Sequence, residues 1–181
     1  MHDPRIDQLA DVLLDHSCSI EPGEHVLIEA FDLPEQNLVC ALVEGAARRG
    51  AIPVAEVKSV NVQRSLFRSA TEDSMKLCGE IERSRMERMQ AYIGIRGSEN
   101  VSEMAGVRDE IMKKHGRLYM KPVHFDQRVN HTRWCVLRWP TPSMAQLAQM
   151  NTEAFEDFYF RVCTLDYAKM DKAVQQLAKR M

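Results

Sequence analysis

The sequence predicts an α/β protein built on an open, parallel, Rossmann-like sheet of four or five strands, with helices on both faces. Short apolar runs rich in β-formers alternate along the chain with longer segments of helical periodicity. No turn sequence typical of a hairpin joins two of the short runs, which favours parallel strands connected by helices. A chain of 181 residues is long enough for one domain and too short for two ordinary ones, so we treat residues 1–181 as a single domain.

The N-terminal third predicts a helix followed by a β-α-β unit. Asp3 can cap free backbone N–H groups and Pro4 has no N–H to lose, so the first helix begins there, and we expect it to end near Ser19. Such a unit is almost always right-handed. Its three elements are a strand at 25–30, a helix at 34–49 and a strand at 51–58.

The rest of the chain keeps the same alternation. Residues 61–90 are helical in pattern, and Thr71 suits an N-cap. Pro122 interrupts the segment 117–130, for which helix is favoured over strand. Thr141 and Pro142 begin a helix as cap and first helical residue. The other expected elements are strands at 91–96 and 132–139 and helices at 102–115, 152–164 and 167–180.

Composition excludes several classes of protein. Hydrophobic residues make up 45% and charged residues 28%, as in globular proteins, and the net charge of −2 disfavours a nucleic-acid partner. No apolar run approaches the roughly 18 residues of a membrane span, so no membrane partner is expected. The N-terminal segment MHDPRIDQLA lacks the apolar core of a signal peptide, which predicts a cytoplasmic location.

No local sequence motif indicates a catalytic centre. The five cysteines contain no CxxC pair and lie in apolar stretches, which predicts buried free thiols rather than nucleophiles or ligands. The histidines form no HExxH motif, and there is no GxSxG elbow. His124 and Asp126 are close enough in sequence to ligate a metal, but an irregular surface segment explains them as well. The first β-α junction has no glycine, which argues against a dinucleotide site.

The segment 133–146, RWCVLRWPTPSMAQ, is the most unusual in the sequence. In a strand its Arg and Trp residues alternate between faces, and such interleaving can stack on bases. A strand at the edge of its core gives the same pattern, and this structural interpretation is favoured because the chain is not basic.

The order of these motifs resembles the thermophilic-type metalloaminopeptidases, peptidase family M29. The similarity begins with DPRIDQLADVLLDHS (3–17) and EPGEHVLIEA (21–30) and includes GSEN (97–100). Its most specific part is NHTRWCVLRWPTPSMAQLAQMNTEAFEDFYFRVCTLDY (130–167), with Arg-Trp in a strand, Pro-Thr-Pro after it and then Met-Ala-Gln. The resemblance covers essentially the whole chain.

The resemblance implies a metal-dependent aminopeptidase that releases N-terminal amino acids from peptides. Enzymes of this family are about twice as long, and their C-terminal half binds two divalent ions (Zn, Co or Mg). The chain therefore resembles an N-terminal domain that lacks catalytic and metal-binding residues and any cofactor of its own. Its expected partners are a C-terminal catalytic half, peptide substrate and a second copy in a homodimer. The alternative is a stand-alone binding or interaction module, and some relatives are dioxygenases that act on pyridine rings.

Four residues are candidates for substrate binding. Ligands of open parallel sheets gather at the carboxyl ends of the strands. That edge includes Asp32 after the first strand, Asn100 after the third, and Trp139 with Thr141 after the fourth. Each also has a sufficient local explanation, as a turn, cap or packing residue.

Overall fold

The computed structural model describes residues 3–180, apart from the side chains of residues 168 and 176. A four-stranded, all-parallel sheet with the strand order β2-β1-β3-β4 forms its centre. The strands are β1 (His25–Phe31), β2 (Ile52–Lys58), β3 (Ala91–Arg96) and β4 (Arg133–Arg138). All four strands predicted from the sequence are confirmed within one or two residues, as is their parallel direction.

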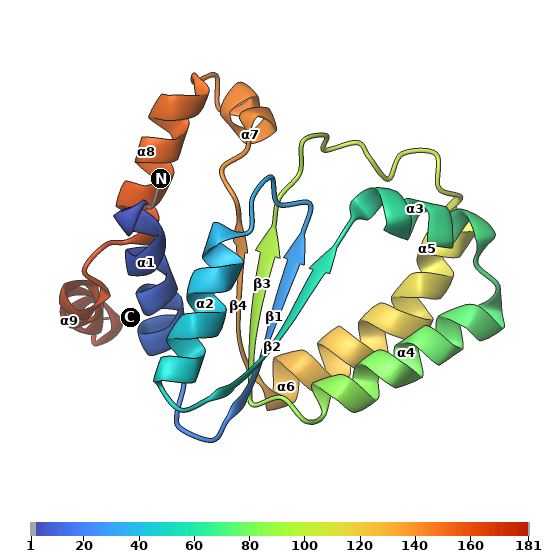
Figure 1. Ribbon diagram of the computed structural model, residues 1–181, viewed down its shortest axis with the longest axis horizontal. Helices are drawn as coiled ribbons and strands as arrows, with labels where there is room; N and C mark the ends of the chain where they lie inside the picture. Colours follow the sequence, from blue (N-terminus) through green and yellow to red (C-terminus); the bar gives the residue numbers. More distant parts are fainter. Residues whose placement is uncertain (1–2, 181) are drawn as a thin grey trace.

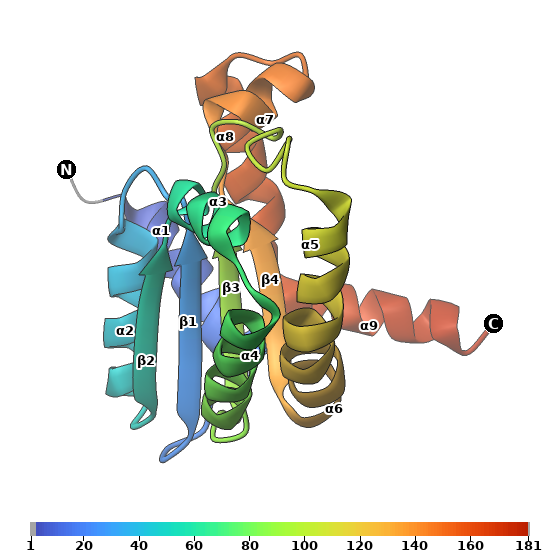
Figure 2. The same ribbon diagram turned by 90° about the vertical axis from the view of Figure 1, so that its right-hand side faces the viewer.

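Helices cover both faces of the sheet (Figures 1 and 2). On one face, α1 (Pro4–Asp11), η1 (Val12–Ser17) and α2 (Asn37–Arg48) enclose the larger core. On the other face, α4 (Glu72–Met86) and η2 (Gly116–Arg128) enclose a smaller core around Leu27 and Tyr92. The remaining helices are α3 (Val60–Ser69), α5 (Asp109–His115), α6 (Val129–His131), α7 (Pro142–Leu147), α8 (Thr152–Cys163) and α9 (Tyr167–Ala178).

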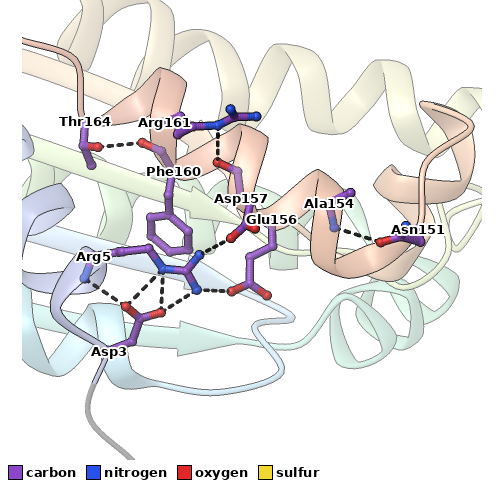
Figure 3. A network of polar contacts seen from close by, with 9 residues as sticks. All are labelled: Asp3, Arg5, Asn151, Ala154, Glu156, Asp157, Phe160, Arg161 and Thr164. Atoms are coloured by element: carbon purple, nitrogen blue, oxygen red, sulfur yellow. Dashed lines mark hydrogen bonds and ion pairs between the residues drawn. The ribbon is translucent and has the colours of Figure 1, made fainter.

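Helix α8 is held against α1 by a cluster of charges around Arg5 (Figure 3). The Arg5 guanidinium donates hydrogen bonds to Asp3, to Glu156 at 2.6 Å and to Asp157 at 2.7 Å. It also lies 4.5 Å from the centre of the Phe160 ring, which is buried in the larger core. The predicted N-terminal cap is confirmed, because the Asp3 carboxylate accepts a hydrogen bond from the Arg5 backbone N–H.

Pro122 does not end the helix in which it lies. The segment η2 forms a π-type helix that contains Pro122 and runs directly on from α5. Wider turns accommodate a proline because the missing N–H and the ring displace only part of the hydrogen-bond ladder. The sequence prediction of helix over strand for residues 117–130 is confirmed, whereas the helix expected at 102–115 begins only at Asp109.

The prediction that every cysteine is buried is wrong. Cys18 is fully buried, and burial raises the pKa of its thiol to about 12. Cys135 and Cys163 are half-buried, but Cys40 and Cys78 are exposed. Both exposed residues lie on helices, α2 and α4, whose neighbouring apolar residues supply the buried face instead. Among the described residues, no helix is both long and apolar enough to cross a bilayer.

Candidate functional site

A buried carboxylate lies on the sheet face that α4 and η2 cover. Glu29 in β1 is only 2% exposed. Its Oε1 accepts a hydrogen bond from Lys58 Nζ at 2.7 Å, and its Oε2 accepts one from the Tyr92 hydroxyl at 2.5 Å. Arg96 donates to the same Oε2 over a longer distance of 3.4 Å. Three adjacent strands thus contribute one side chain or more to a single polar cluster.

The absence of a side chain at Gly94 makes this arrangement possible. Tyr92 and Gly94 are two residues apart in β3, so they lie on the same face of the sheet. A Cβ atom at Gly94 would come within 2.9 Å of both Cε1 and the hydroxyl of Tyr92. The Tyr92 ring therefore lies along the strand over Gly94, and this position brings its hydroxyl to Glu29 and to Arg96, which donates to it at 2.9 Å.

The cluster keeps Glu29 ionised. Burial alone would raise the pKa of this carboxyl group, but the charge of Lys58 and the hydrogen bonds from Lys58 and Tyr92 outweigh it, and the pKa falls to about 2. Burial and the neighbouring Glu29 raise the pKa of Tyr92 to about 12, so the phenol stays protonated and donates. A carboxylate held in this way is a poor general base at neutral pH, and the cluster acts as a fixed electrostatic element.

A second group of side chains surrounds the Tyr92 ring. The Arg128 guanidinium of η2 lies 4.7 Å from the centre of this ring and 5.2 Å from that of Trp134 in β4. His124 is 7% exposed and meets Tyr92 edge-on, with 6.4 Å between ring centres. Burial, followed by the positive charge of Arg128, lowers the pKa of His124 to about 4, so its ring is neutral.

An open groove of about 690 Å³ adjoins the cluster at the edge strand β2. Its walls are mainly apolar, from α3 and α4, with Lys58 and Glu56 at the sheet side and His115 and Tyr119 beside them. The His115 and Tyr119 rings are stacked with centres 4.8 Å apart. The size is within the range of small-molecule and peptide sites.

Two of the four residues predicted from the sequence shape turns at the carboxyl edge. Asp32 has a positive φ of 46°, and its carboxylate accepts a hydrogen bond from the Val60 N–H at 2.9 Å. Asn100 accepts a hydrogen bond from the Ser102 N–H at 3.0 Å and donates one to Glu103 at 2.9 Å. Both side chains thus have the local roles that the sequence also allowed.

The other two are buried. Thr141 is 1% exposed, and its hydroxyl donates a hydrogen bond to the Ser98 carbonyl at 2.8 Å. Trp139 is 6% exposed and packs edge-on against Tyr159 and Phe160, with ring centres 6.4 Å and 6.0 Å away. Its indole is part of the larger core rather than of the edge.

The structure brings three of these four residues to one segment. The Gly97 N–H donates to the Phe31 carbonyl at 2.8 Å, and a Cβ at Gly97 would lie 2.3 Å from the Asp32 carbonyl oxygen. Thr141 binds the next residue, Ser98, and Asn100 follows two positions later. Asp32 and Thr141 therefore lie next to the segment 97–100, which Asn100 ends, while the Trp139 side chain packs in the larger core. Their role toward a substrate stays a prediction.

Sequence reasoning missed the Glu29 cluster and Arg128. A signal was present, because Glu29 stands in the otherwise apolar run HVLIEAF and a buried charge requires partners. The partners of Glu29 could not be found, since they come from positions 58, 92 and 96. The alternative that His124 and Asp126 form a metal site is not supported, because His124 is buried while the exposed Asp126 pairs with Lys121 at 2.7 Å.

The described residues do not fit a two-metal centre. Within residues 3–180, no three histidine, cysteine, aspartate or glutamate side chains are grouped so that they could hold a metal ion. No step of a metal-dependent reaction is therefore assigned to the side chains of this part of the chain.

The parallel sheet with helices on both faces defines an α/β protein of open-sheet, Rossmann-like architecture. The model of the thermophilic metalloprotease (M29) family matches residues 2–181, and the chain therefore belongs to this family. No curated protein sequence matches it.

The comparison with solved structures gives one match that shares the fold and one weaker match. Wild-type AmpT from Thermus thermophilus superposes with a TM-score of 0.65 at 16% identity, covering 89% of this chain and 43% of AmpT. An alcohol dehydrogenase superfamily protein from Novosphingobium aromaticivorans has a TM-score of only 0.36 at 13% identity, with 91% of this chain and 49% of that protein covered. The chain thus spans less than half the length of either protein, and the likeness to AmpT concerns the fold alone.

Proposed function

We propose that this chain is the N-terminal domain of a metal-dependent aminopeptidase and that a C-terminal half supplies the metal site. The observation that carries the proposal is the family match across residues 2–181. The fold likeness to AmpT supports it, because the match covers only 43% of AmpT and leaves the rest of that protein for a second half. When bound in such a half, two divalent ions lower the pKa of a water molecule and stabilise the charge that develops during peptide hydrolysis.

In this proposal the domain shapes the chamber in which a peptide lies. The segment 97–100 follows the carboxyl end of β3. It is held by two hydrogen bonds, one from the Gly97 N–H to the Phe31 carbonyl and one from the Thr141 hydroxyl to the Ser98 carbonyl. A wall held by hydrogen bonds within the fold positions a substrate with little loss of conformational entropy on binding. The chain's own contribution is therefore to bind and orient the peptide and to exclude water, with the chemistry assigned to the other half.

The test compares the purified chain with a reconstituted enzyme. Alone, the chain should release no p-nitroaniline from amino-acid p-nitroanilides with added Co²⁺, Zn²⁺ or Mg²⁺. Mixed or fused with the C-terminal half of an M29 enzyme, it should form a complex by size-exclusion chromatography and give metal-dependent turnover. Metal-dependent activity of the chain alone, free of contaminating peptidase, would contradict the division of roles.

The second candidate is a stand-alone binding module of the same fold. The open groove of about 690 Å³ beside β2 favours it, because the groove can hold a ligand without any second half. Failure to bind any C-terminal half, together with saturable ligand binding by the chain, would favour this function over the first.

A further inference from the structure

Within the part of the chain that the structure describes, Arg128 is a cation without an acidic partner. Among residues 3–180, no carboxylate or carbonyl accepts a hydrogen bond from its guanidinium, and its buried Nε has no hydrogen-bond partner of any kind. The nearby Glu29 is already engaged by Lys58, Tyr92 and Arg96. A half-buried arginine with free donors lacks the compensation that its desolvation normally requires.

The aromatic rings on either side of Arg128 hold the guanidinium in place. Its carbon atom Cζ lies 4.7 Å from the Tyr92 ring centre and 5.2 Å from the Trp134 ring centre. Tyr92 and Trp134 are aligned in the register of β3 and β4, so their side chains leave the sheet on the same face. Contact with both rings restricts the guanidinium, and its N–H groups, which bond to no acceptor among residues 3–180, are left for a planar anion.

An apolar surface lies next to this cation. Trp134 is 44% exposed, and Val136, two residues along the same face of β4, is 40% exposed. Opposite Val136 in the register is Gly94, over which the Tyr92 ring lies. The free N–H groups of Arg128 and an exposed apolar strip are thus presented together on one face of the sheet.

The local electrostatic potential is positive. After burial, Arg128 is the strongest influence that lowers the pKa of the neighbouring His124. Arg96 and Lys58 act in the same direction, and Glu29 opposes them. His124 is 7% exposed, and its Nδ1 has no hydrogen-bond partner within the described part of the chain. Cations therefore outnumber anions around the Tyr92 ring, and a negatively charged ligand would lower the electrostatic energy.

We propose that Arg128, Tyr92, Trp134 and Val136 form a binding site for a carboxylate that carries an apolar body. The guanidinium of Arg128 would receive the carboxylate through two parallel hydrogen bonds, for which its planar geometry is suited. The apolar body would lie on Trp134 and Val136. A peptide with a free C-terminus and a small apolar acid share this chemistry, and the site is independent of whether the chain belongs to a peptidase.

Isothermal titration calorimetry on the 181-residue chain at low salt tests the site. The probes are N-acetyl-L-phenylalanine, its amide and the tripeptide Ala-Ala-Phe with a free carboxylate. The acid should bind at least about ten-fold more tightly than the amide, because the amide cannot accept the paired hydrogen bonds. Tighter binding of the tripeptide than of the acid would identify a peptide C-terminus as the ligand, and the reverse order a small acid. Equal binding of acid and amide, or no binding of either, would overturn the proposal.

Variants assign the binding to Arg128. Arg128→Gln should weaken binding of the acid by about ten-fold or more, and Arg128→Lys by less, because lysine keeps the charge and loses the planar fork. Arg117→Gln is the matched control, since Arg117 lies exposed on the same helix and pairs with Glu72 at 3.4 Å. Unchanged affinity in Arg128→Gln would exclude the site.

A measurement on the unmodified chain covers the case in which the variants fail to fold. The protein has two tryptophans, of which Trp134 is half-exposed beside Arg128 and Trp139 is buried in the other core. In a ¹H–¹⁵N NMR titration, the acid should shift the indole N–H signal of Trp134 and leave that of Trp139 in place. Shifts of neither signal, or of Trp139 alone, would also reject the proposal.

Discussion

Lys58 at the end of β2 reaches across to Glu29 in β1, with 2.7 Å between Nζ and Oε1. The Glu29 side chain is 3% exposed and the Lys58 side chain 21%, so most of the pair is withdrawn from water. Tyr92 and Arg96 in β3 complete the contacts of the same carboxylate. Side chains of three strands, β1, β2 and β3, are thus bonded to one another on one face of the sheet. They lie near the carboxyl ends of the strands, from which the loops extend.

The first prediction concerns the removal of the charge at Glu29. Glu29→Gln should lower the free energy of unfolding by about 3–5 kcal/mol, because Lys58 and Arg96 are left without their buried anion. Urea denaturation followed by circular dichroism measures the loss. The double variant Glu29→Gln/Lys58→Met should be more stable than the single one, since it removes the unpaired cation as well. Additive losses in the double variant would show that the two side chains do not interact.

The second prediction concerns His124 and mild acid. Its folded pKa of about 4 lies below the ordinary value of 6.5, so the folded state binds its proton less readily than the unfolded state. The corresponding stabilisation is complete above pH 6.5 and is lost as the pH falls toward 4, by about 3 kcal/mol in all. His124→Gln should flatten this part of the profile of unfolding free energy against pH. Burial also lowers the pKa of His115, so the profile of the His124→Gln variant should keep a smaller slope.

Glu29 titrates in a separate, lower window. Its pKa is depressed to about 2, so its contribution is present above the ordinary value of 4.5 and is lost only as the pH falls from there toward 2. In wild-type protein the two losses should follow one another on acidification. A His124→Gln variant whose stability still falls by the full amount between pH 6.5 and 4.5 would contradict the assignment of the upper window.

The third prediction concerns the segment at the carboxyl edge. Thr141→Val keeps the shape of the side chain and removes the hydroxyl that donates to the Ser98 carbonyl at 2.8 Å. We expect a loss of about 1–2 kcal/mol in unfolding free energy, because a partly buried carbonyl loses a partner. Ser143 also donates to this carbonyl, so Ser143→Ala should add to the effect. Hydrogen exchange of the amides at 97–100 should become faster in the double variant, and unchanged exchange would show that these hydroxyls do not fix the segment.

Local pattern predicted the elements well but not their partners. Apolar runs found all four strands, and capping chemistry found the starts of α1 and α4, where Thr71 and Ser74 exchange hydrogen bonds. The strand order β2-β1-β3-β4 depends on contacts between distant segments, which periodicity does not contain. Pro122 was expected to interrupt a helix, but packing of η2 against α4 holds it in helical structure.

The candidate site divides in the same way. The rule that ligands gather at the carboxyl ends of parallel strands selected Asp32, Asn100 and Thr141, which the structure places in or next to the segment 97–100, and their role toward a ligand stays a prediction. It also selected Trp139, which directly follows β4. Its side chain turns into the larger core, because it continues the face of β4 on which Cys135 and Leu137 lie. The cluster at Glu29 could be recognised only after three strands had been placed side by side, and no local pattern places them.

The last prediction separates the two roles that the sequence allowed for Trp139. Its contacts with Tyr159 and Phe160 in the larger core favour packing, so Trp139→Ala should cost about 3–5 kcal/mol of unfolding free energy, whereas Trp139→Phe keeps a ring and should cost less. In a complete enzyme that carries this domain, kcat/KM per folded molecule should then stay near the wild-type value at a temperature where all variants are folded. A raised KM in Trp139→Ala with unchanged metal content and full folding would instead make the indole part of a substrate surface. Thr141→Val is the matched comparison, because its hydroxyl supports the edge segment itself. A change of KM in that variant alone would place substrate at the segment and leave Trp139 to the core.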